Sequence, residues 1–378
     1  MIVKLGSLIS EYSVRNKADE NIPVYSVTNE QGFCTGYFSK EVASQDRTTY
    51  KIVPRGCFAY NPSRINVGSV DVQECEDRVI VSPLYVVFSV DEKLNRRYLL
   101  HYLKSDITLT YIKAYASGSV RDNLKFSILK DFPINLPSAE EQEQIVATLD
   151  GIEHLIALRK EELDSLDELV KSRFIELFGD PDTNPLGWNE DVLSEHLEVI
   201  GGYAFKSDKF EDEGIPVLRI GNINSGRFLP VNMVYWNDDP ALERYKMYPG
   251  DLVMSLTGTV GKDDYGNVCI LGADYPEYYL NQRNAKLSLK PTLNAKYLSE
   301  LLKFERIKRR LTGISRGVRQ ANISNKDILC LCVPIAPINL QQQFAAFVEQ
   351  TDKSKLAVQK ALEELEILKK SLMQQYFG

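Results

Sequence analysis

Residues 138–179 carry apolar side chains at steps of three, four and seven, with charged side chains between them. Ser138 followed by Glu141 is the capping box of a helix start. Gly179 and then Pro181 are typical of a helix end. This spacing predicts a long helix, spacer helix 1, over residues 138–180 at about 1.5 Å per residue. Its predicted buried seam consists of Ile145, Leu149, Ile152, Ile156, Leu163, Leu166, Val170 and Leu177.

The end of the chain repeats this pattern. A shift of 199 residues places Leu163 on Leu362 and Phe178-Gly179 on Phe377-Gly378. Asn339 followed by Gln342 indicates the start of spacer helix 2, residues 338–378. Two such seams in one chain can bury each other, most simply as an antiparallel coiled pair. The predicted second seam consists of Phe344, Val348, Val358, Leu362, Leu365 and Leu372.

The residues outside the helices also repeat. Residues 1–137, head 1, carry strand patterns at 21–27, 78–81 and 84–88 with turns between them, and a helical pattern at 96–105. Residues 181–337, head 2, follow the same plan, with Tyr98-Leu99 matching Tyr297-Leu298. We therefore expect an α+β protein: two similar globular domains separated by two long antiparallel helices, with an internal pseudo-two-fold repeat. Such an arrangement suits a ligand with two separated sites.

Charge and composition limit the possible functions. The net charge is −7 and the pI about 5.3, which argues against a uniformly basic nucleic-acid binder. A local basic surface remains compatible with that sum. Apolar residues make up 44% of the chain, and they form no uninterrupted run long enough for a membrane span. With no signal peptide pattern either, we expect a cytoplasmic protein without a membrane partner.

The sequence contains no convincing catalytic or metal motif. The six cysteines form no CxxC pair, and His101, His154 and His196 fit neither a metal site nor a triad. Asn61-Pro62-Ser63-Arg64 lacks the second proline and the aromatic residue of an amino-methyltransferase motif. Residues 258–262 are too short for a phosphate-binding loop. We predict a recognition protein with no catalytic residue, no metal and no cofactor of its own.

Head 2 contains a strongly basic segment. Seven lysines and arginines fall between Lys303 and Arg319, opposed only by Glu305. A solvated helix face is the usual interpretation of a charge run, but this one continues into a glycine-containing loop that a nucleic-acid backbone could approach. The turn at 257–262 could present further donors. The DNA-contacting residues predicted for head 2 are Thr257, Thr259, Lys262, Arg309, Arg310, Arg316, Arg319 and Gln320.

Head 1 contains similar candidate DNA-contacting segments, with fewer basic residues than head 2. The loop at 61–66 ends a strand and carries asparagine and arginine, which can pair bidentately with adenine and guanine edges. Taken alone, it would be interpreted as a plain turn. The DNA-contacting residues predicted for head 1 are Asn61, Ser63, Arg64, Asn66, Ser119 and Arg121.

These features together resemble the DNA-specificity subunits of type I restriction–modification enzymes. The resemblance covers essentially the whole chain, and no single motif carries it alone. It rests on the order and duplication of several segments: Lys171-Ser172-Arg173-Phe174-Ile175-Glu176-Leu177-Phe178-Gly179-Asp180-Pro181, Asn184-Pro185-Leu186-Gly187-Trp188, Gly118-Ser119-Val120-Arg121 and Gly317-Val318-Arg319.

The resemblance implies two target-recognition domains, each reading one half of a split double-stranded DNA site, with the helices fixing the gap. It also implies assembly with two adenine-N6 methyltransferase (modification) subunits and with restriction–translocase subunits. S-adenosylmethionine, ATP and Mg²⁺ would be bound by those partners. The exposed flanks of the helices are expected to dock the modification subunits.

Two other functions are compatible with parts of the sequence. A coiled-coil scaffold with two protein-binding heads would share the helices, and DNA binding that needs both heads would exclude it. A bifunctional methyltransferase would require S-adenosylmethionine binding by the isolated chain, for which the sequence offers no cofactor loop.

Overall fold

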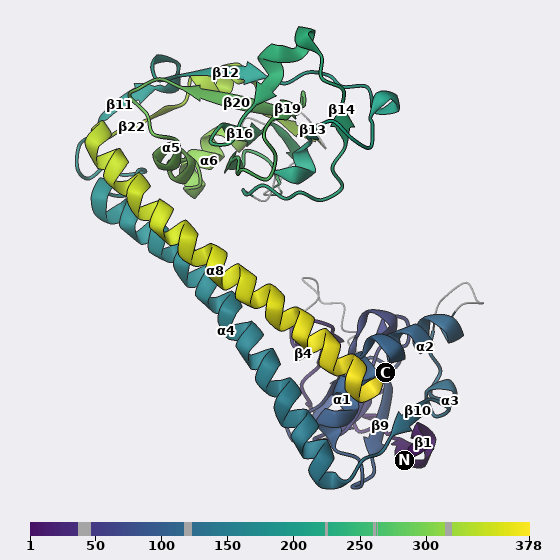
Figure 1. Ribbon diagram of the computed structural model, residues 1–378. Coiled ribbons are helices and arrows are strands. Elements are labelled where there is room, and N and C mark those ends of the chain that lie inside the picture. The colour runs from purple at the N-terminus through teal and green to yellow at the C-terminus, as the bar shows by residue number, and fades with distance from the viewer. Residues whose placement is uncertain (37–46, 117–122, 224–225, 260–261, 263, 314–319) are drawn as a thin grey trace. The chain divides into compact units, whose positions relative to one another are not determined.

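The computed structural model describes residues 1–36, 47–116, 123–223, 226–259, 262, 264–313 and 320–378. The chain divides into two compact units. Unit 1 comprises Met1–Glu161 with Gln359–Gly378, and unit 2 comprises Glu162–Val358. Each unit contains one head together with parts of the two long helices, α4 (Ala139–Phe178) and α8 (Ile338–Phe377), labelled in Figure 1.

Head 1 is built on an antiparallel sheet of order β2-β9-β6-β7, and helix α1 packs against this sheet at β7. Phe58 lies opposite Phe88 in the β6–β9 register, and the two rings stack at 5.1 Å in the core. Smaller sheets pair β1 with β10, β3 with β4 and β5 with β8. The strands are β1 (Ile2–Lys4), β2 (Ile9–Glu11), β3 (Ser26–Thr28), β4 (Gly32–Cys34), β5 (Lys51–Pro54), β6 (Phe58–Tyr60), β7 (Val70–Val72), β8 (Arg78–Val81), β9 (Val86–Val90) and β10 (Pro133–Asn135), and the helices α1 (Arg96–Lys104), α2 (Asp106–Ala116) and α3 (Phe126–Leu129).

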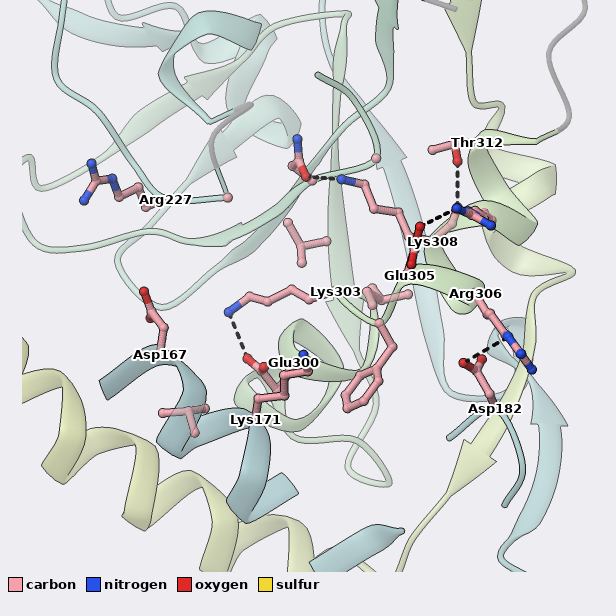
Figure 2. A pocket seen from close by; sticks show the side chains of 18 of the residues that line it. Asp167, Lys171, Asp182, Arg227, Glu300, Lys303, Glu305, Arg306, Lys308 and Thr312 are labelled. Atoms are coloured by element: carbon pink, nitrogen blue, oxygen red, sulfur yellow. Dashed lines mark hydrogen bonds and ion pairs between the residues drawn. The ribbon is translucent and has the colours of Figure 1, made fainter. Parts of the chain in front are cut away.

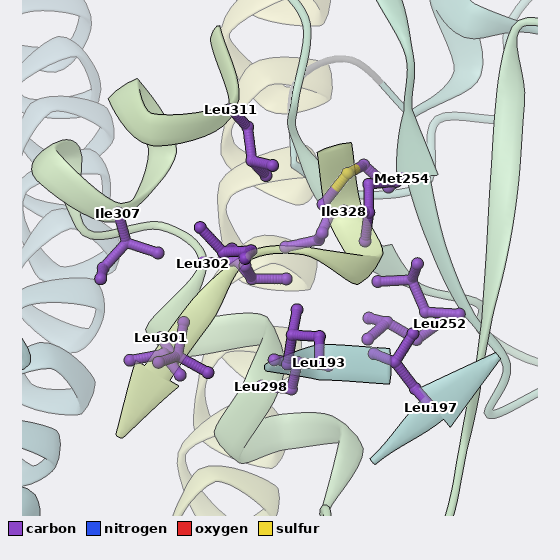
Figure 3. Packing of buried hydrophobic residues seen from close by; sticks show 14 of the residues in the cluster. Leu193, Leu197, Leu252, Met254, Leu298, Leu301, Leu302, Ile307, Leu311 and Ile328 are labelled. Atoms are coloured by element: carbon purple, nitrogen blue, oxygen red, sulfur yellow. The ribbon is translucent and has the colours of Figure 1, made fainter. Parts of the chain in front are cut away.

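Head 2 repeats this sheet as β12-β20-β16-β18, and the pair β11–β22 matches β1–β10. A second sheet, β14-β13-β19-β15, and the pair β17–β21 complete its described strands. The strands are β11 (Asn189–Val192), β12 (Leu197–Gly201), β13 (Ile215–Leu218), β14 (Tyr235–Trp236), β15 (Lys246–Met247), β16 (Leu252–Ser255), β17 (Thr257–Thr259), β18 (Val268–Ile270), β19 (Tyr278–Leu280), β20 (Asn284–Leu289), β21 (Gln320–Asn322) and β22 (Cys332–Ile335), and the helices α5 (Ala295–Leu301), α6 (Glu305–Thr312) and α7 (Asn325–Leu329). Figure 3 shows leucines of α5 and α6 packed on Leu252 and Met254 of the central sheet.

Equivalent hydrogen bonds confirm the internal repeat. The Tyr98 hydroxyl donates to the Asn135 carbonyl at 2.9 Å, and the Tyr297 hydroxyl donates to the Pro334 carbonyl at 2.8 Å. Asn95 and Asn294 cap α1 and α5 in the same manner. These pairs are separated by the 199 residues that the apolar pattern predicts.

Spacer helix 1 begins and ends where the sequence predicts. The Glu141 N–H donates to Ser138 Oγ at 3.2 Å, and the Glu141 carboxylate accepts the Ser138 N–H at 2.9 Å. These hydrogen bonds from Ser138 lower the pKa of Glu141. Gly179 follows α4 with a φ of +75°, the left-handed conformation of a helix C-terminus.

Spacer helix 2 begins at the predicted residue 338, but Asn339 does not cap it. Asn339 lies inside the first turn of α8, which begins at Ile338. The Leu340 and Gln341 N–H groups donate to the Pro337 carbonyl. Pro337 occupies the position of Ser138 in the repeat, and proline has no side-chain oxygen to cap the helix, so the sequence lacks the usual start signal.

The two long helices pair antiparallel in both units. In unit 1, Phe377 near the end of α8 shares a core with Leu149 in the first part of α4. In unit 2, Phe344 near the start of α8 packs against Phe174 near the end of α4, with ring centroids 5.4 Å apart. Of the predicted seam residues, Leu149, Ile152, Val170, Phe344 and Val358 are buried, and Ile145, Ile156, Leu163, Leu166, Leu177, Val348, Leu362, Leu365 and Leu372 are partly buried. The fold is thus α+β, with two similar globular domains and two long antiparallel helices.

Two strands of head 1 start later than predicted. The pattern at 21–27 yields β3 only from Ser26, because the preceding residues bond to Ile80 of β8 through an isolated bridge at Val24. The pattern at 84–88 yields β9 from Val86, after a turn in which the Tyr85 N–H donates to the Ser82 carbonyl. Within the described part of the chain, no helix combines the length and the apolar character that a membrane span needs.

Candidate nucleic-acid interface

The structure pairs the described ends of the two predicted DNA-binding segments of head 2. Strand β17 pairs antiparallel with β21, so that Thr257 faces Asn322 and Thr259 faces Gln320. In an antiparallel pair the exit of one strand lies beside the entrance of the other. Thr259 at the end of β17 therefore lies beside Gln320 at the start of β21. Arg316 and Arg319 lie outside the described residues, as does the side chain of Gln320.

Hydrogen bonds hold the end of β17 in place. The Asp264 carboxylate accepts the Thr259 N–H at 2.8 Å, and this hydrogen bond lowers the pKa of Asp264. A Cβ at Gly258 would lie 2.8 Å from Tyr265 Cβ, so this position has no room for a side chain. The Tyr265 hydroxyl donates to the Thr312 carbonyl at 2.7 Å and thereby ties the turn to the end of α6. Asp264 and Tyr265 thus join the end of β17 to the end of α6.

Helix α6 distributes its basic residues between two roles. Ile307 and Leu311 are buried in the head 2 core. Arg310 donates to the Cys332 carbonyl at 3.0 Å, which makes it a structural contact with β22. Arg309 is exposed and forms an i,i+4 ion pair with Glu305. Of the two arginines predicted to contact DNA in this helix, Arg309 is therefore better placed for it.

A concavity of about 1250 Å³ lies beside this turn and helix in unit 2 (Figure 2). Lys262 and Arg309 line it together with six further basic residues, Lys171, Arg227, Lys303, Arg306, Lys308 and Lys355. Lys303 and Lys308 belong to the predicted basic run. Arg227 is remote from that run in sequence and follows Gly226, so no motif marks it.

Head 1 holds its predicted loop in the same manner. The Leu124 N–H donates to the Pro62 carbonyl at 3.1 Å, and the equivalent Ile323 N–H donates to the Leu256 carbonyl at 2.8 Å. In head 1 this hydrogen bond joins the loop after β6 to Leu124, and in head 2 it joins the end of β16 to Ile323. Ser119 and Arg121 lie outside the described residues.

Within this loop, part of the predicted recognition chemistry is used internally. Asn61 Oδ1 accepts hydrogen bonds from the Ser63 N–H and hydroxyl at 3.1 and 2.9 Å, as in an Asx turn. Ser63 and Arg64 are exposed, whereas Asn66 is half-buried in a short helical turn. Asn61 therefore shapes the loop, and Arg64 is the longest side chain that it presents to solvent.

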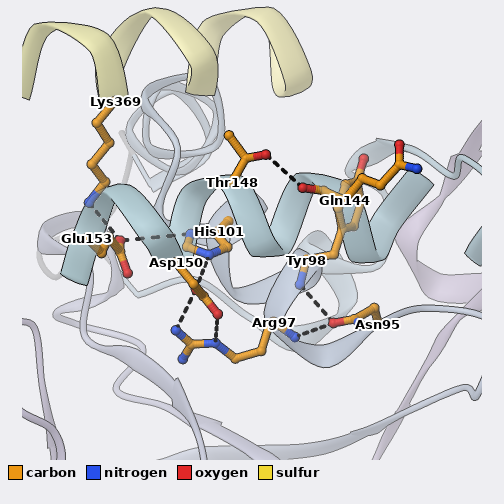
Figure 4. Close-up of polar contacts among 9 residues, drawn as sticks. All are labelled: Asn95, Arg97, Tyr98, His101, Gln144, Thr148, Asp150, Glu153 and Lys369. Atoms are coloured by element: carbon orange, nitrogen blue, oxygen red, sulfur yellow. Dashed lines mark hydrogen bonds and ion pairs between the residues drawn. The ribbon is translucent and has the colours of Figure 1, made fainter. Parts of the chain in front are cut away.

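Unit 1 also contains a polar cluster that no sequence motif predicts (Figure 4). His101 Nε2 lies 2.7 Å from Asp150 Oδ1, and His101 also faces Glu153. Burial lowers the pKa of His101, despite both carboxylates. Arg97 pairs with Asp150 at 2.8 Å, and Lys369 pairs with Glu153 at 2.7 Å. Because both carboxylates already have cationic partners, the cluster is better suited to joining α1, α4 and α8 than to holding a metal.

Comparison with known proteins identifies the family. The type I restriction modification DNA specificity domain matches this chain twice, over residues 6–168 and 185–367. The chain belongs to this family. Each match covers one head and most of the long helix that follows it, which agrees with the repeat of the structure.

Individual members of the family are distant in sequence. The type I restriction enzyme MjaVIII specificity subunit of Methanocaldococcus jannaschii is 25% identical over 298 residues, which cover 73% of this chain and 68% of that protein. Two solved structures share the fold over the full chain with a TM-score of 0.58. One concerns complex assembly and conformational transition of the type I R-M system, at 18% identity and 97% coverage of its chain. The other is the S subunit from M. genitalium, at 15% identity and 96% coverage.

Proposed function

We propose that this specificity chain reads a split double-stranded DNA target, with one half bound by each head. The observation that carries the proposal is the paired-loop arrangement, present once per head. The head 2 arrangement combines polar side chains suited to base edges with nearby cations suited to phosphates, and the head 1 loop presents Ser63 and Arg64 to solvent. The side chains differ between the heads, with Arg64 in one and Thr257 and Thr259 in the other. The two half-sites therefore differ in sequence.

The chain acts as a non-catalytic subunit in the cytoplasm and recruits the subunits that carry out catalysis. Two adenine-N6 modification subunits and restriction–translocase subunits are its proposed partners. S-adenosylmethionine, ATP and Mg²⁺ belong to those subunits. Family membership supports this division of labour, as does the use of the buried polar residues described above for structure.

Substituting Lys262 tests the interface in head 2. Lys262→Ala should weaken binding of the assembled complex to specific and non-specific DNA by a similar factor. If this ammonium group contacts one phosphate, the slope of log K against log salt should become less steep by about 0.9. Fluorescence anisotropy over a salt series measures both. Lys353→Ala, an exposed position on α8, is the matched control. An unchanged affinity and slope for Lys262→Ala would remove Lys262 from the interface.

A further inference from the structure

One face of the β17–β21 pair in head 2 points away from the protein core. Side chains alternate between the two faces of a strand, and residues opposite each other in a pair share a face. Ala321 and Ile323 are buried in the core of head 2, and Gly258 lies opposite Ala321 on this inner face. Thr257 lies opposite Asn322, so the side chains of these two residues share the outer face.

The side-chain amide of Asn322 is held beside the Thr257 hydroxyl and is open to a ligand. Asn322 is exposed and Thr257 is half-buried. The Ile323 N–H donates to the Leu256 carbonyl, which makes Thr257 and Asn322 a non-hydrogen-bonded pair, the kind in which opposite side chains lie closest. Within the part of the chain that the structure describes, no hydrogen bond occupies the Asn322 amide. Its backbone position is fixed by the strand pairing, while its polar atoms are available.

Head 1 contains the same asparagine. The 199-residue shift relates Asn322 to Asn123, which is also exposed and has no hydrogen bond from its amide to any described residue. The Leu124 N–H donates to the Pro62 carbonyl, as the Ile323 N–H does to the Leu256 carbonyl. Asn123 and Ser63 are the residues next to this hydrogen bond on its two chain segments. Each head thus sets an exposed asparagine beside a hydroxyl residue.

The neighbouring loop positions differ between the heads. Aligning Pro62 with Leu256 places Arg64 on Gly258 and Ile65 on Thr259. A feature of the ligand that differs between the halves requires different residues, whereas a feature common to both halves can be recognised by the same residue. The proposed half-sites differ in sequence, but each contains an adenine, because each is modified at adenine N6. Adenine is therefore the base that a residue common to both heads is suited to read.

The chemistry of asparagine matches that base. Its amide can accept a hydrogen bond from adenine N6 and donate one to adenine N7 at the same time, at the major-groove edge. Guanine presents two acceptors at that edge and cannot pair with asparagine in this way. The major groove also admits a two-stranded β-ribbon, so the outer face of β17–β21 can bring Asn322 to a base edge.

We propose that Asn322 and Asn123 are specificity-determining residues, each of which reads one adenine in the half-site bound by its head. The inference rests on the proposed function and adds which residue recognises which base. The contact belongs to recognition of the intact duplex, before a methyltransferase takes its target base out of the stack. Thr257 and Ser63 lie beside the two amides and complete the polar surface at each position.

Truncating each asparagine tests the proposal in the assembled complex. The methylated motif of the wild type is determined first, and fluorescence anisotropy then measures binding to that motif and to duplexes in which each base pair is replaced in turn. Asn322→Ala should weaken binding to the motif by about tenfold to a hundredfold and abolish discrimination at one A·T pair in one half. Asn123→Ala should do the same in the other half. Non-specific binding should stay unchanged, as should all binding by the exposed controls Asn189→Ala and Asn21→Ala.

Asn322→Asp is a second variant with nearly the same shape, so it tests base recognition even if the alanine variant folds poorly. A carboxylate can accept from cytosine N4 but cannot donate to adenine N7, so this variant should prefer cytosine to adenine at the same position. Wild-type discrimination in both Asn322 variants would overturn the inference. Relaxation at a G·C pair, or an equal loss of specific and non-specific affinity, would overturn it as well. A wild-type complex without a split motif would instead refute the proposed function, and this inference with it.

Discussion

Phe174→Ala is expected to lower the unfolding free energy of unit 2 by about 3–5 kcal/mol, the usual cost of truncating a buried aromatic residue. Phe174 is fully buried near the end of α4. Its ring lies against Tyr297 at 5.4 Å, Phe304 at 5.1 Å and Phe344 at 5.4 Å. The truncation would leave a cavity where α4, α8 and head 2 meet, and rigid neighbouring rings can fill little of it.

Urea denaturation of the full chain, followed by tryptophan fluorescence, measures this effect. Trp188 and Trp236 both belong to unit 2, so the signal reports on that unit. Ile175→Ala is the matched control, because Ile175 is the next residue of α4 and is 42% exposed. A Phe174 variant no less stable than this control would mean that the aromatic cluster does not join the helices to head 2.

Gln341→Leu is expected to destabilise unit 2 by about 2–4 kcal/mol, because it leaves buried backbone groups without partners. Gln341 is fully buried in the first turn of α8. Its Oε1 accepts the Asn294 N–H at 2.8 Å, and its Nε2 donates to the Ala336 carbonyl at 2.7 Å and the Thr292 carbonyl at 3.2 Å. Leucine has a similar volume and can replace none of these hydrogen bonds.

The repeat provides an internal check on this prediction. Gln142 makes the equivalent hydrogen bonds in unit 1, accepting from Asn95 and donating to the carbonyls of Lys93 and Pro137. Gln142→Leu should therefore produce a similar loss in unit 1, measured by hydrogen exchange of α1 amides. Gln342→Leu, at an exposed position beside Gln341, should change stability little. Similar stabilities for the Gln341 and Gln342 variants would contradict a clamping role for Gln341.

The long helices and the internal repeat were predictable because their signals are local. The capping box at Ser138, the left-handed Gly179 and a regular apolar spacing suffice to place α4 without tertiary information. The start signal of α8 was misassigned to Asn339, because Pro337 provides no capping side chain. Phe174 was absent from the predicted seam even though it is fully buried. It packs into the aromatic cluster of head 2, and a helical period does not reveal contacts with another domain.

The interface was only partly predictable, because it depends on pairing between distant residues. The sequence suggested both the 257–262 turn and the segment before Gln320, but the pairing of β17 with β21, which places Thr259 beside Gln320, is a matter of strand register. Arg227 joins the same concavity without any motif of its own. The internal use of Asn61 and Arg310 was likewise invisible, since residue type does not distinguish a side chain that binds its own backbone from one available to DNA.

The division of the target between the heads can be tested by exchanging one of them. Residues 1–137 are replaced by the corresponding residues of another family member, and the chimera is co-expressed with its modification subunits. Sequencing that detects N6-methyladenine then gives the methylated motif of the wild type and of the chimera. The account predicts a split motif in which the exchange alters one half and leaves the other half and the gap unchanged. A change in both halves, or an unchanged motif, would contradict the claim that each head reads its own half of the DNA.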